Sequence, residues 1–235
     1  MPKTNFRTAS LVLLVLILSS SLVLASPPTD AGTFPNNWYS DASNIGYFPH
    51  NNSSPWTSLK VAFARTSGCG MSSANLATIG GYGFDNWATN LILSRTSGTQ
   101  ADYHINQICI TRSEATALGF PSNADAGAAT WTSYTTPYYA KTNTNQTMLI
   151  HQISKTDIYY VWDATTTASY SLDKWKAIAV HENGHALGYT GHDVNSTSVN
   201  KAIMHPHTNV YFDTWVILST QVRDRTHINN TYSKF

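Results

Sequence analysis

Alternation of apolar and polar residues predicts where the strands of this chain lie. Between Leu59 and Ala64 the two kinds of residue alternate with the period of two that a half-buried strand shows. Further runs predict a short strand over 91–93 and longer strands over 103–110, 148–153 and 157–162. The stretch 113–145 is rich in Ala, Thr, Ser and Tyr, and we expect loops there.

Helical periodicity predicts three helices. The first spans about 72–90, where apolar residues recur at helical spacing and three glycines, Gly80, Gly81 and Gly83, would allow close packing against a sheet. The second spans about 172–189, after the N-cap residue Ser171, and is apolar on more than one side. The third starts near Ser219. This order of elements predicts an α+β domain with a sheet packed on helices.

The first 25 residues predict a secretory signal peptide. Lys3 and Arg7 form a basic start, residues 11–24 are apolar apart from three serines, and small residues precede a cleavage point after Ala25. A retained N-terminal anchor is the alternative. No later segment is long and apolar enough to cross a bilayer. We therefore expect a secreted, extracellular protein.

The remainder divides into an N-terminal segment and one domain. Residues 26–57 are rich in Pro, Asn, Ser and aromatic residues and are expected to be irregular, whereas 58–235 is long enough for a single core. Loss of Lys3 and Arg7 with the leader leaves 12 basic and 13 acidic residues, a net charge of −1. Nothing here predicts a nucleic-acid partner, which would need a basic patch, or a membrane partner after signal cleavage.

The segment His181-Glu182-Asn183-Gly184-His185 carries the strongest chemical signal. Positions i and i+4 share one face of a helix, so the imidazoles of His181 and His185 can bind one metal ion. Glu182 stands beside the first ligand as a candidate general base. Gly188 can end the helix in a left-handed conformation, after which His192 can supply a third ligand. Three imidazoles with one open position suit Zn²⁺ in a hydrolytic site.

Together with Ala202-Ile203-Met204-His205-Pro206, this motif resembles the metzincin metalloproteases, most closely the matrixin-like branch. There the helical motif is followed by a tight turn that reads Ala-Leu-Met-Tyr-Pro, with the Met beneath the zinc. The resemblance implies a twisted mixed β-sheet packed on a long active-site helix, and a C-terminal helix after the Met-turn. It also implies that Met204 forms the floor of the site.

The chain departs from the family pattern in two places. Family spacing puts the third ligand at Gly191, so His192 comes one residue late, and Asp193 competes with it because snapalysin-like enzymes use Asp. His205 replaces the usual Tyr; we expect His205 and His207 to line the substrate pocket or face solvent. The family's structural zinc and calcium loops are not recognisable over 111–156, so no second metal is predicted.

Motif and resemblance together predict a zinc-dependent endopeptidase acting on proteins or peptides, with Glu182 as general base. The strand at 148–153 or 157–162 would bind extended substrate along a sheet edge. The main alternative is a secreted zinc-bearing binding or adhesion protein without turnover, in which Glu182 would be dispensable. A metal hydrolase acting on something other than peptides is the narrower alternative. The natural substrate, the activation route and the oligomeric state stay open.

The two cysteines, Cys69 and Cys109, predict one disulfide, because export would place them in an oxidising compartment. The alternatives are two unpaired buried thiols, or an inhibitory metal-binding thiol at Cys69.

Overall fold

The computed structural model describes residues 29–34, 44–48, 58–91, 93–120, 126–142 and 147–232. The expected signal peptide, residues 1–25, lies outside these ranges. Two strands, β1 (Thr29–Phe34) and β2 (Asn44–Tyr47), lie within the segment 26–57. The expectation that this whole segment is irregular is therefore wrong for these residues. Both strands join the sheet of the following domain.

A seven-stranded mixed sheet forms the centre of the fold. Its strands run in the order β1-β6-β7-β5-β3-β4, and β2 pairs with β7 off this path. The other strands are β3 (Leu59–Arg65), β4 (Arg95–Ser97), β5 (Ile105–Thr111), β6 (Gly127–Thr142) and β7 (Thr147–Trp162). Among the strands that the structure describes, only β6 and β7 pair antiparallel, and every other pairing is parallel. The sheet is thus mixed, as expected, but mostly parallel.

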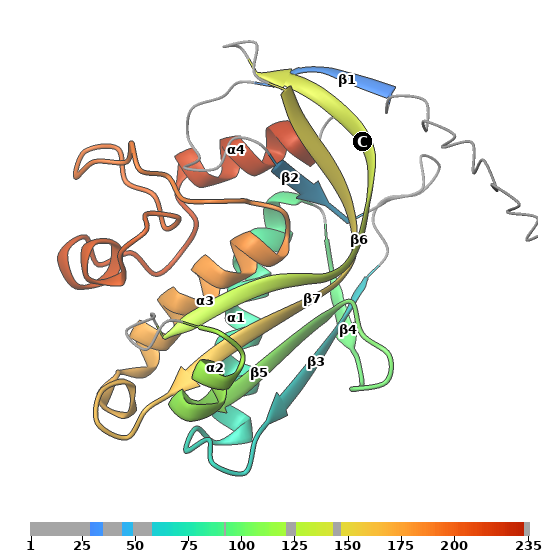
Figure 1. Ribbon diagram of the computed structural model, residues 1–235. Coiled ribbons are helices and arrows are strands. Elements are labelled where there is room, and N and C mark those ends of the chain that lie inside the picture. The colour runs from blue at the N-terminus through green and yellow to red at the C-terminus, as the bar shows by residue number, and fades with distance from the viewer. Residues whose placement is uncertain are drawn as a thin grey trace, which may run out of the picture.

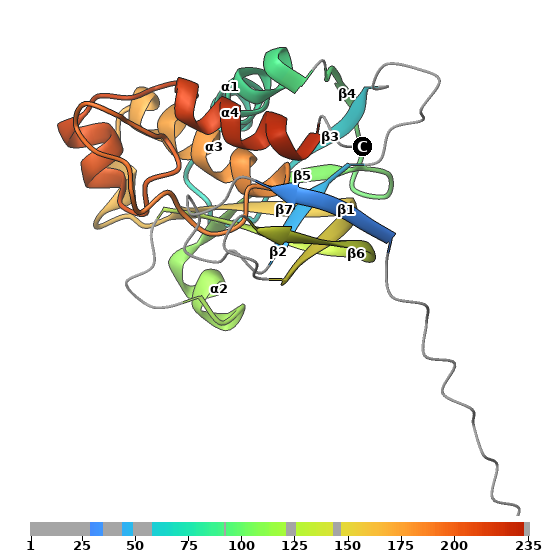
Figure 2. The same cartoon turned by 90° about the horizontal axis from the view of Figure 1, so that it is seen from above.

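Helices α1, α3 and α4 cover one face of this sheet, and the short helix α2 lies on the other (Figure 2). Their bounds are α1 (Ser73–Leu91), α2 (Arg112–Ala117), α3 (Leu172–Ala186) and α4 (Val222–Tyr232). A 3₁₀ turn (Thr167–Ser169) and a π-helical segment (Asn209–Thr214) complete the elements. Figure 1 shows α3 alongside α1 on this face of the sheet. The result is a mixed α/β fold, in which none of the described helices has both the length and the hydrophobicity of a membrane span.

Helix α3 is held close to α1 because Gly83 has no side chain. A Cβ added at Gly83 would lie 2.6 Å from the carbonyl oxygen of Ala179 in α3. Trp87 of α1 donates from Nε1 to the carbonyl oxygen of Val180 at 2.6 Å. Gly83 therefore packs against a helix rather than against the sheet, unlike Gly80, which packs against the Gln107 side chain of β5.

A buried polar network joins α3 to the sheet. Tyr160 of β7 donates from its hydroxyl to Gln107 Oε1 of β5 at 2.6 Å. Gln107 Nε2 donates to the carbonyl oxygen of Gly80 at 3.1 Å and lies 3.5 Å from Asn183 Oδ1 of α3. All three side chains are completely buried. Because a buried polar group needs a partner, this network fixes the position of α3 on the sheet more narrowly than apolar packing alone would.

Several predicted elements differ from the structure. The short strand expected over 91–93 is not found at the two positions described there, because Leu91 ends α1 and Leu93 lies in no strand. The stretch 113–145, expected to be loops, contains most of α2 and the whole of β6. Residues 148–153 and 157–162 are parts of one strand, β7, and not two strands. Helices expected over 72–90, 172–189 and from near Ser219 are present as α1, α3 and α4.

Cys69 and Cys109 form a disulfide, as predicted. The bond connects the loop before α1 to β5, and no cysteine of the chain is left unpaired. Both alternatives are thereby excluded: neither cysteine is an unpaired buried thiol, and Cys69 is not a metal-binding inhibitor.

Candidate metal centre

Helix α3 carries His181, Glu182 and His185 toward one side of the molecule. Ser171 caps its start by accepting a hydrogen bond from Lys174 N at 3.1 Å. His181 and Glu182 are 5% and 6% exposed, whereas His185 is half-buried at the last turn. A charged or polar pair buried this deeply needs a chemical reason.

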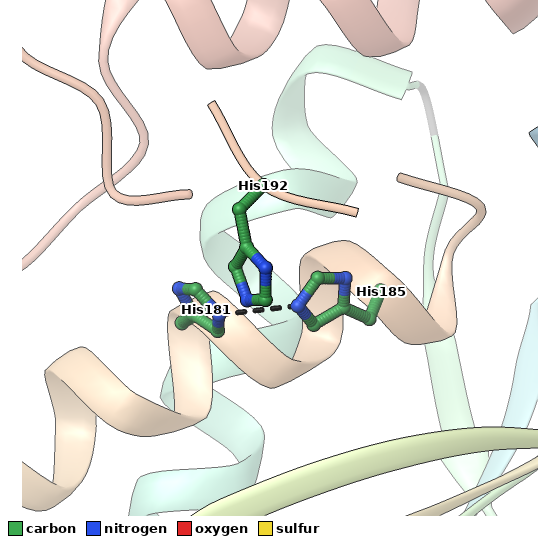
Figure 3. Close-up of side chains that lie close together, drawn as sticks. All are labelled: His181, His185 and His192. Atoms are coloured by element: carbon green, nitrogen blue, oxygen red, sulfur yellow. Dashed lines mark hydrogen bonds between the residues drawn. The ribbon is translucent and has the colours of Figure 1, made fainter. Parts of the chain in front are cut away.

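The chain turns back after α3 and brings His192 over this face. Gly188 has φ of +114° and Gly191 has φ of +64°, conformations that favour glycine. The ring centroid of His192 lies 5.2 Å from that of His181 and 5.0 Å from that of His185. One nitrogen from each of the three rings lies within 4.8 Å of the other two. Figure 3 shows the three rings gathered over α3. These three histidines could hold a metal ion.

Backbone carbonyls fix which ring nitrogens of His181 and His185 face inward. The Nδ1 atom of His181 lies 2.8 Å from Ile203 O, and that of His185 lies 2.7 Å from Tyr189 O. A carbonyl oxygen can only accept, so each Nδ1 carries a proton and each Nε2 has a bare lone pair. The two Nε2 atoms face each other at 3.1 Å. Two lone pairs at this distance fit a cation between them.

Burial keeps these imidazoles neutral. Desolvation, followed by the neighbouring His185 and His192, lowers the pKa of His181 well below its usual value of 6.5. The same cause, with His192 second, lowers the pKa of His185 to about 3. At neutral pH both rings are therefore unprotonated at Nε2, which is the form that binds a metal.

Asp193 does not join the three histidines. Its completely buried carboxylate pairs with the guanidinium of Arg223 in α4, with Arg223 Nη2 at 2.9 Å from Asp193 Oδ1. Asp193 Oδ1 also accepts from the backbone of Asn195 at 3.2 Å. Of the two candidates for the third ligand, His192 therefore lies beside His181 and His185, whereas Asp193 lies in an ion pair with Arg223.

Met204 lies directly behind α3. A Cβ added at Gly184 would lie 2.5 Å from the sulfur of Met204, which is completely buried. The turn that carries Met204 is held by Asp224 of α4, which accepts from Ile203 N at 2.9 Å, Met204 N at 3.2 Å and Gln221 N at 2.8 Å. Burial raises the pKa of Asp224 to about 6. Because Ile203 also binds His181, α4 supports a candidate ligand through this turn.

A cavity of about 620 Å³ opens beside the three histidines. Glu182 lines it, and a Cβ added at Gly127 of β6 would lie 2.6 Å from Glu182 Oε1. The remaining lining comes from β6, the turn after α3 and one residue after α2: Phe120, Ala128–Trp131, Tyr134 and Tyr189–Gly191. The carboxylate thus borders the same space as the histidines.

The strand beside this cavity is β6. We expected β7 to offer an open edge to substrate, but β7 lies inside the sheet, with β6 on one side and β2 and β5 on the other, so that expectation is wrong. Strand β1 pairs with β6 only from Tyr138 to Thr142. In the part of the chain that the structure describes, the opening half of β6 has no strand on its outer side.

Sequence reasoning missed several residues around the cluster. Tyr211 stacks on His181 with centroids 5.3 Å apart and an interplanar angle of 13°. Trp131 of β6 donates from Nε1 to the carbonyl oxygen of His185 at 2.9 Å. Both are aromatic and far from α3 in sequence, and no local pattern marks them. His205 and His207 lie apart from the three histidines, with His205 packed on Trp215 at 5.1 Å.

Comparisons with known proteins add little to this geometry. No protein-family model matches the chain, and neither does any curated protein. Among solved structures, the crystal structure of myroilysin is similar at 14% identity, with 84% of this chain and 93% of that chain covered and a TM-score of 0.36. A similarity this low carries no argument about what the chain does.

Proposed function

We propose that this chain is a secreted zinc endopeptidase that hydrolyses peptide bonds in proteins. The observation that carries the proposal is the convergence of three histidine rings on one point, with the protonated nitrogens of His181 and His185 turned away onto carbonyl oxygens. Because Nδ1 is the protonated nitrogen of each ring, neither Nε2 can donate to the other, and the two unprotonated nitrogens face each other at 3.1 Å.

The spacing of His181 and His185 fits zinc. Tetrahedral zinc with bonds of about 2.0–2.1 Å needs ligand nitrogens about 3.3 Å apart. The Nε2 atoms of His181 and His185 are 3.1 Å apart. Three imidazole ligands would leave one coordination position open, and a zinc ion held by them would supply a Lewis acid that acidifies water and polarises a carbonyl group.

Glu182 has the position of a general base. It adjoins His181 on α3, its carboxylate borders the cavity, and Gly127 leaves it room. We assign it the proton of the attacking water, which it then transfers to the leaving amine. Met204 supports the ligands from behind as a flexible apolar residue. These assignments match the matrixin-like metzincin pattern to which the sequence motifs are similar.

The substrate we propose is an extended protein or peptide segment. The opening half of β6 lines the cavity and presents its backbone there, so a peptide can add to it as a further strand. Secretion rests on the sequence of residues 1–25, and the disulfide fits an oxidising compartment. We propose no nucleic-acid partner and no membrane partner for the mature chain.

The decisive experiment compares the purified mature protein with Glu182→Ala. The variant should retain one zinc per chain by metal analysis and lose most casein cleavage, at least about 100-fold, because the base is lost while the ligands stay. Asp173→Asn, an exposed acidic residue of α3, is the matched control and should cleave normally. Undiminished cleavage by Glu182→Ala would overturn the mechanism. A zinc-loaded wild type that cleaves no protein would favour the binding protein instead.

A further inference from the structure

Three aromatic rings gather at one end of the cavity. Trp131 and Tyr134 of β6 lie with ring centroids 5.9 Å apart, and both line the cavity. His151 of β7 lies 5.5 Å from Trp131 and 5.0 Å from Tyr134, the latter edge to face. We call Trp131, Tyr134 and His151 the aromatic shelf. It belongs to neither the histidine cluster nor Glu182.

An irregularity in β6 creates the shelf. In a regular strand, residues three apart point to opposite faces. The pairing of β6 with β7 shifts register between Trp131 and Ser133 and again between Ser133 and Tyr134. Such bulges redirect side chains, and here they bring Tyr134 onto the same side as Trp131. A strand that served only to complete the sheet would not need this double shift beside the cavity.

The rear of the shelf is rigid. Trp131 is fixed by its hydrogen bond to the carbonyl oxygen of His185, at 2.9 Å. Its ring also packs on Gly46 of β2, where an added Cβ would lie 2.7 Å from the indole. His151 is 8% exposed and its Nδ1 lies 2.8 Å from Thr136 Oγ1. The shelf is therefore a prepared surface that a ligand does not have to order.

The front of the shelf is open. Tyr134 is 52% exposed, although it contacts two other aromatic rings. A large aromatic side chain that borders a cavity and stays half exposed offers apolar area to a ligand. Packing within the fold explains Trp131, but it leaves the outward half of Tyr134 without a role.

We propose that the aromatic shelf is a specificity subsite that binds an apolar, preferentially aromatic, side chain of the substrate away from the scissile bond. This inference rests on the proposed function. Glu182 adjoins Gly127, and His185 is bonded to Trp131, so the reaction centre lies near the middle of 127–131. At about 3.4 Å per residue along an added strand, the shelf lies about two to five residues from the cleaved bond.

The first test measures the cleavage of synthetic peptides by the zinc-loaded mature protein. Peptides of Ser and Ala carry a single Phe, moved one position at a time from five residues before to five residues after the cleaved bond. One offset of two to five residues should raise kcat/KM about tenfold over the same peptide with Ala in place of Phe, a discrimination typical of an apolar contact. Tyr134→Thr should remove this preference and Tyr134→Phe should keep it, because the ring and not the hydroxyl makes the contact.

The control for these variants is Leu149→Thr, which replaces an exposed apolar residue of β7 outside the cavity. It should keep the wild-type preference. The subsite proposal is overturned if Phe raises kcat/KM at none of these positions, or if Tyr134→Thr leaves the preference for Phe intact.

The second test separates the subsite from catalysis. Zinc-loaded Glu182→Ala is titrated by calorimetry with the best Phe peptide and its Ala counterpart. The Phe peptide should bind about tenfold tighter, and the added change Tyr134→Thr should abolish the difference. If the wild type cleaves nothing but this difference is present, the proposed function fails and the subsite stands. If the two peptides bind equally, the subsite fails whether or not the protein is a protease.

Discussion

Asp224 accepts a hydrogen bond from the backbone N–H of Met204 at 3.2 Å, and so connects α4 to the turn behind the metal centre. The same carboxylate accepts from Ile203, whose carbonyl oxygen receives the Nδ1 proton of His181. The C-terminal helix thus supports a candidate ligand through one intervening residue.

Asp224→Asn should destabilise the protein by about 1–3 kcal/mol, because an amide cannot replace both carboxylate oxygens as acceptors for three N–H groups, two of them buried. Denaturant unfolding followed by circular dichroism measures the loss. Asp213→Asn is the control, since Asp213 forms an exposed pair with Lys174 and should change stability by no more than about 0.5 kcal/mol. Equal stability of both variants would show that Asp224 does not hold the turn.

Gly188→Ala should cost at least about 3 kcal/mol of folding stability. Its φ of +114° disfavours a side chain, and an added Cβ would lie 1.9 Å from the carbonyl oxygen of Gly46. Gly119 gives a matched comparison, because it has φ of +90° but nothing within 4 Å of an added Cβ. Gly119→Ala should therefore cost only about 1 kcal/mol. Similar losses at the two positions, measured by unfolding midpoints, would contradict the role of the contact with β2.

Metal retention should distinguish His192 from Asp193. His192→Ala should lose zinc on dialysis, because it removes one of three converging ligands. Asp193→Ala should keep stoichiometric zinc yet unfold more easily, by about 3–5 kcal/mol, since Arg223 loses its buried partner. Asp193→Asn keeps the size of the side chain if the alanine variant does not fold. Zinc kept without His192 and lost without Asp193 would reverse the assignment.

His227 should make stability fall as the solution becomes more acidic. Burial, with Arg223 second, lowers the pKa of His227 from 6.5 to about 3. Below pH 6.5, His227 is protonated in the unfolded chain but stays neutral in the folded chain. The stability that the neutral ring contributes is therefore lost as the pH falls toward 3. The difference in unfolding free energy between wild type and His227→Gln should shrink by about 1–2 kcal/mol between pH 7 and pH 5. Effects of pH that are common to both proteins cancel in this difference. A difference in unfolding free energy that stays constant with pH would refute the role of His227.

Local patterns in the sequence were sufficient for the parts of the site that lie close together along the chain. His181 and His185 share a helix face because they are four residues apart, and Ser171 marks where that helix begins. Gly191 takes a positive φ, which accommodates the extra residue before His192. The disulfide followed from the presence of two cysteines.

The rest depended on contacts between distant segments. Strand β6 was missed because it contains few aliphatic residues. Its Thr, Tyr and Trp residues also favour strands, but they were interpreted as a loop. We expected a break between two strands at Ser154–Thr156. β7 continues there because β6 pairs with Lys155 and Thr156, and β5 pairs with Thr156. The partners of Asp193 and Asp224 come from α4 or from another turn, and no spacing rule reveals such long-range pairs.

Tyr232 adds a consequence for the order of folding. Its hydroxyl donates to the carbonyl oxygen of Leu187 at 2.7 Å and accepts from Phe48 N at 3.3 Å. One oxygen thereby joins the residue after β2, helix α4 and the residue two positions after His185, across sequence separations of 45 and 184 residues. Contacts of such long range are slow to form. During folding, α3 can therefore bring His181 and His185 together early, while the frame that fixes them is completed among the last contacts.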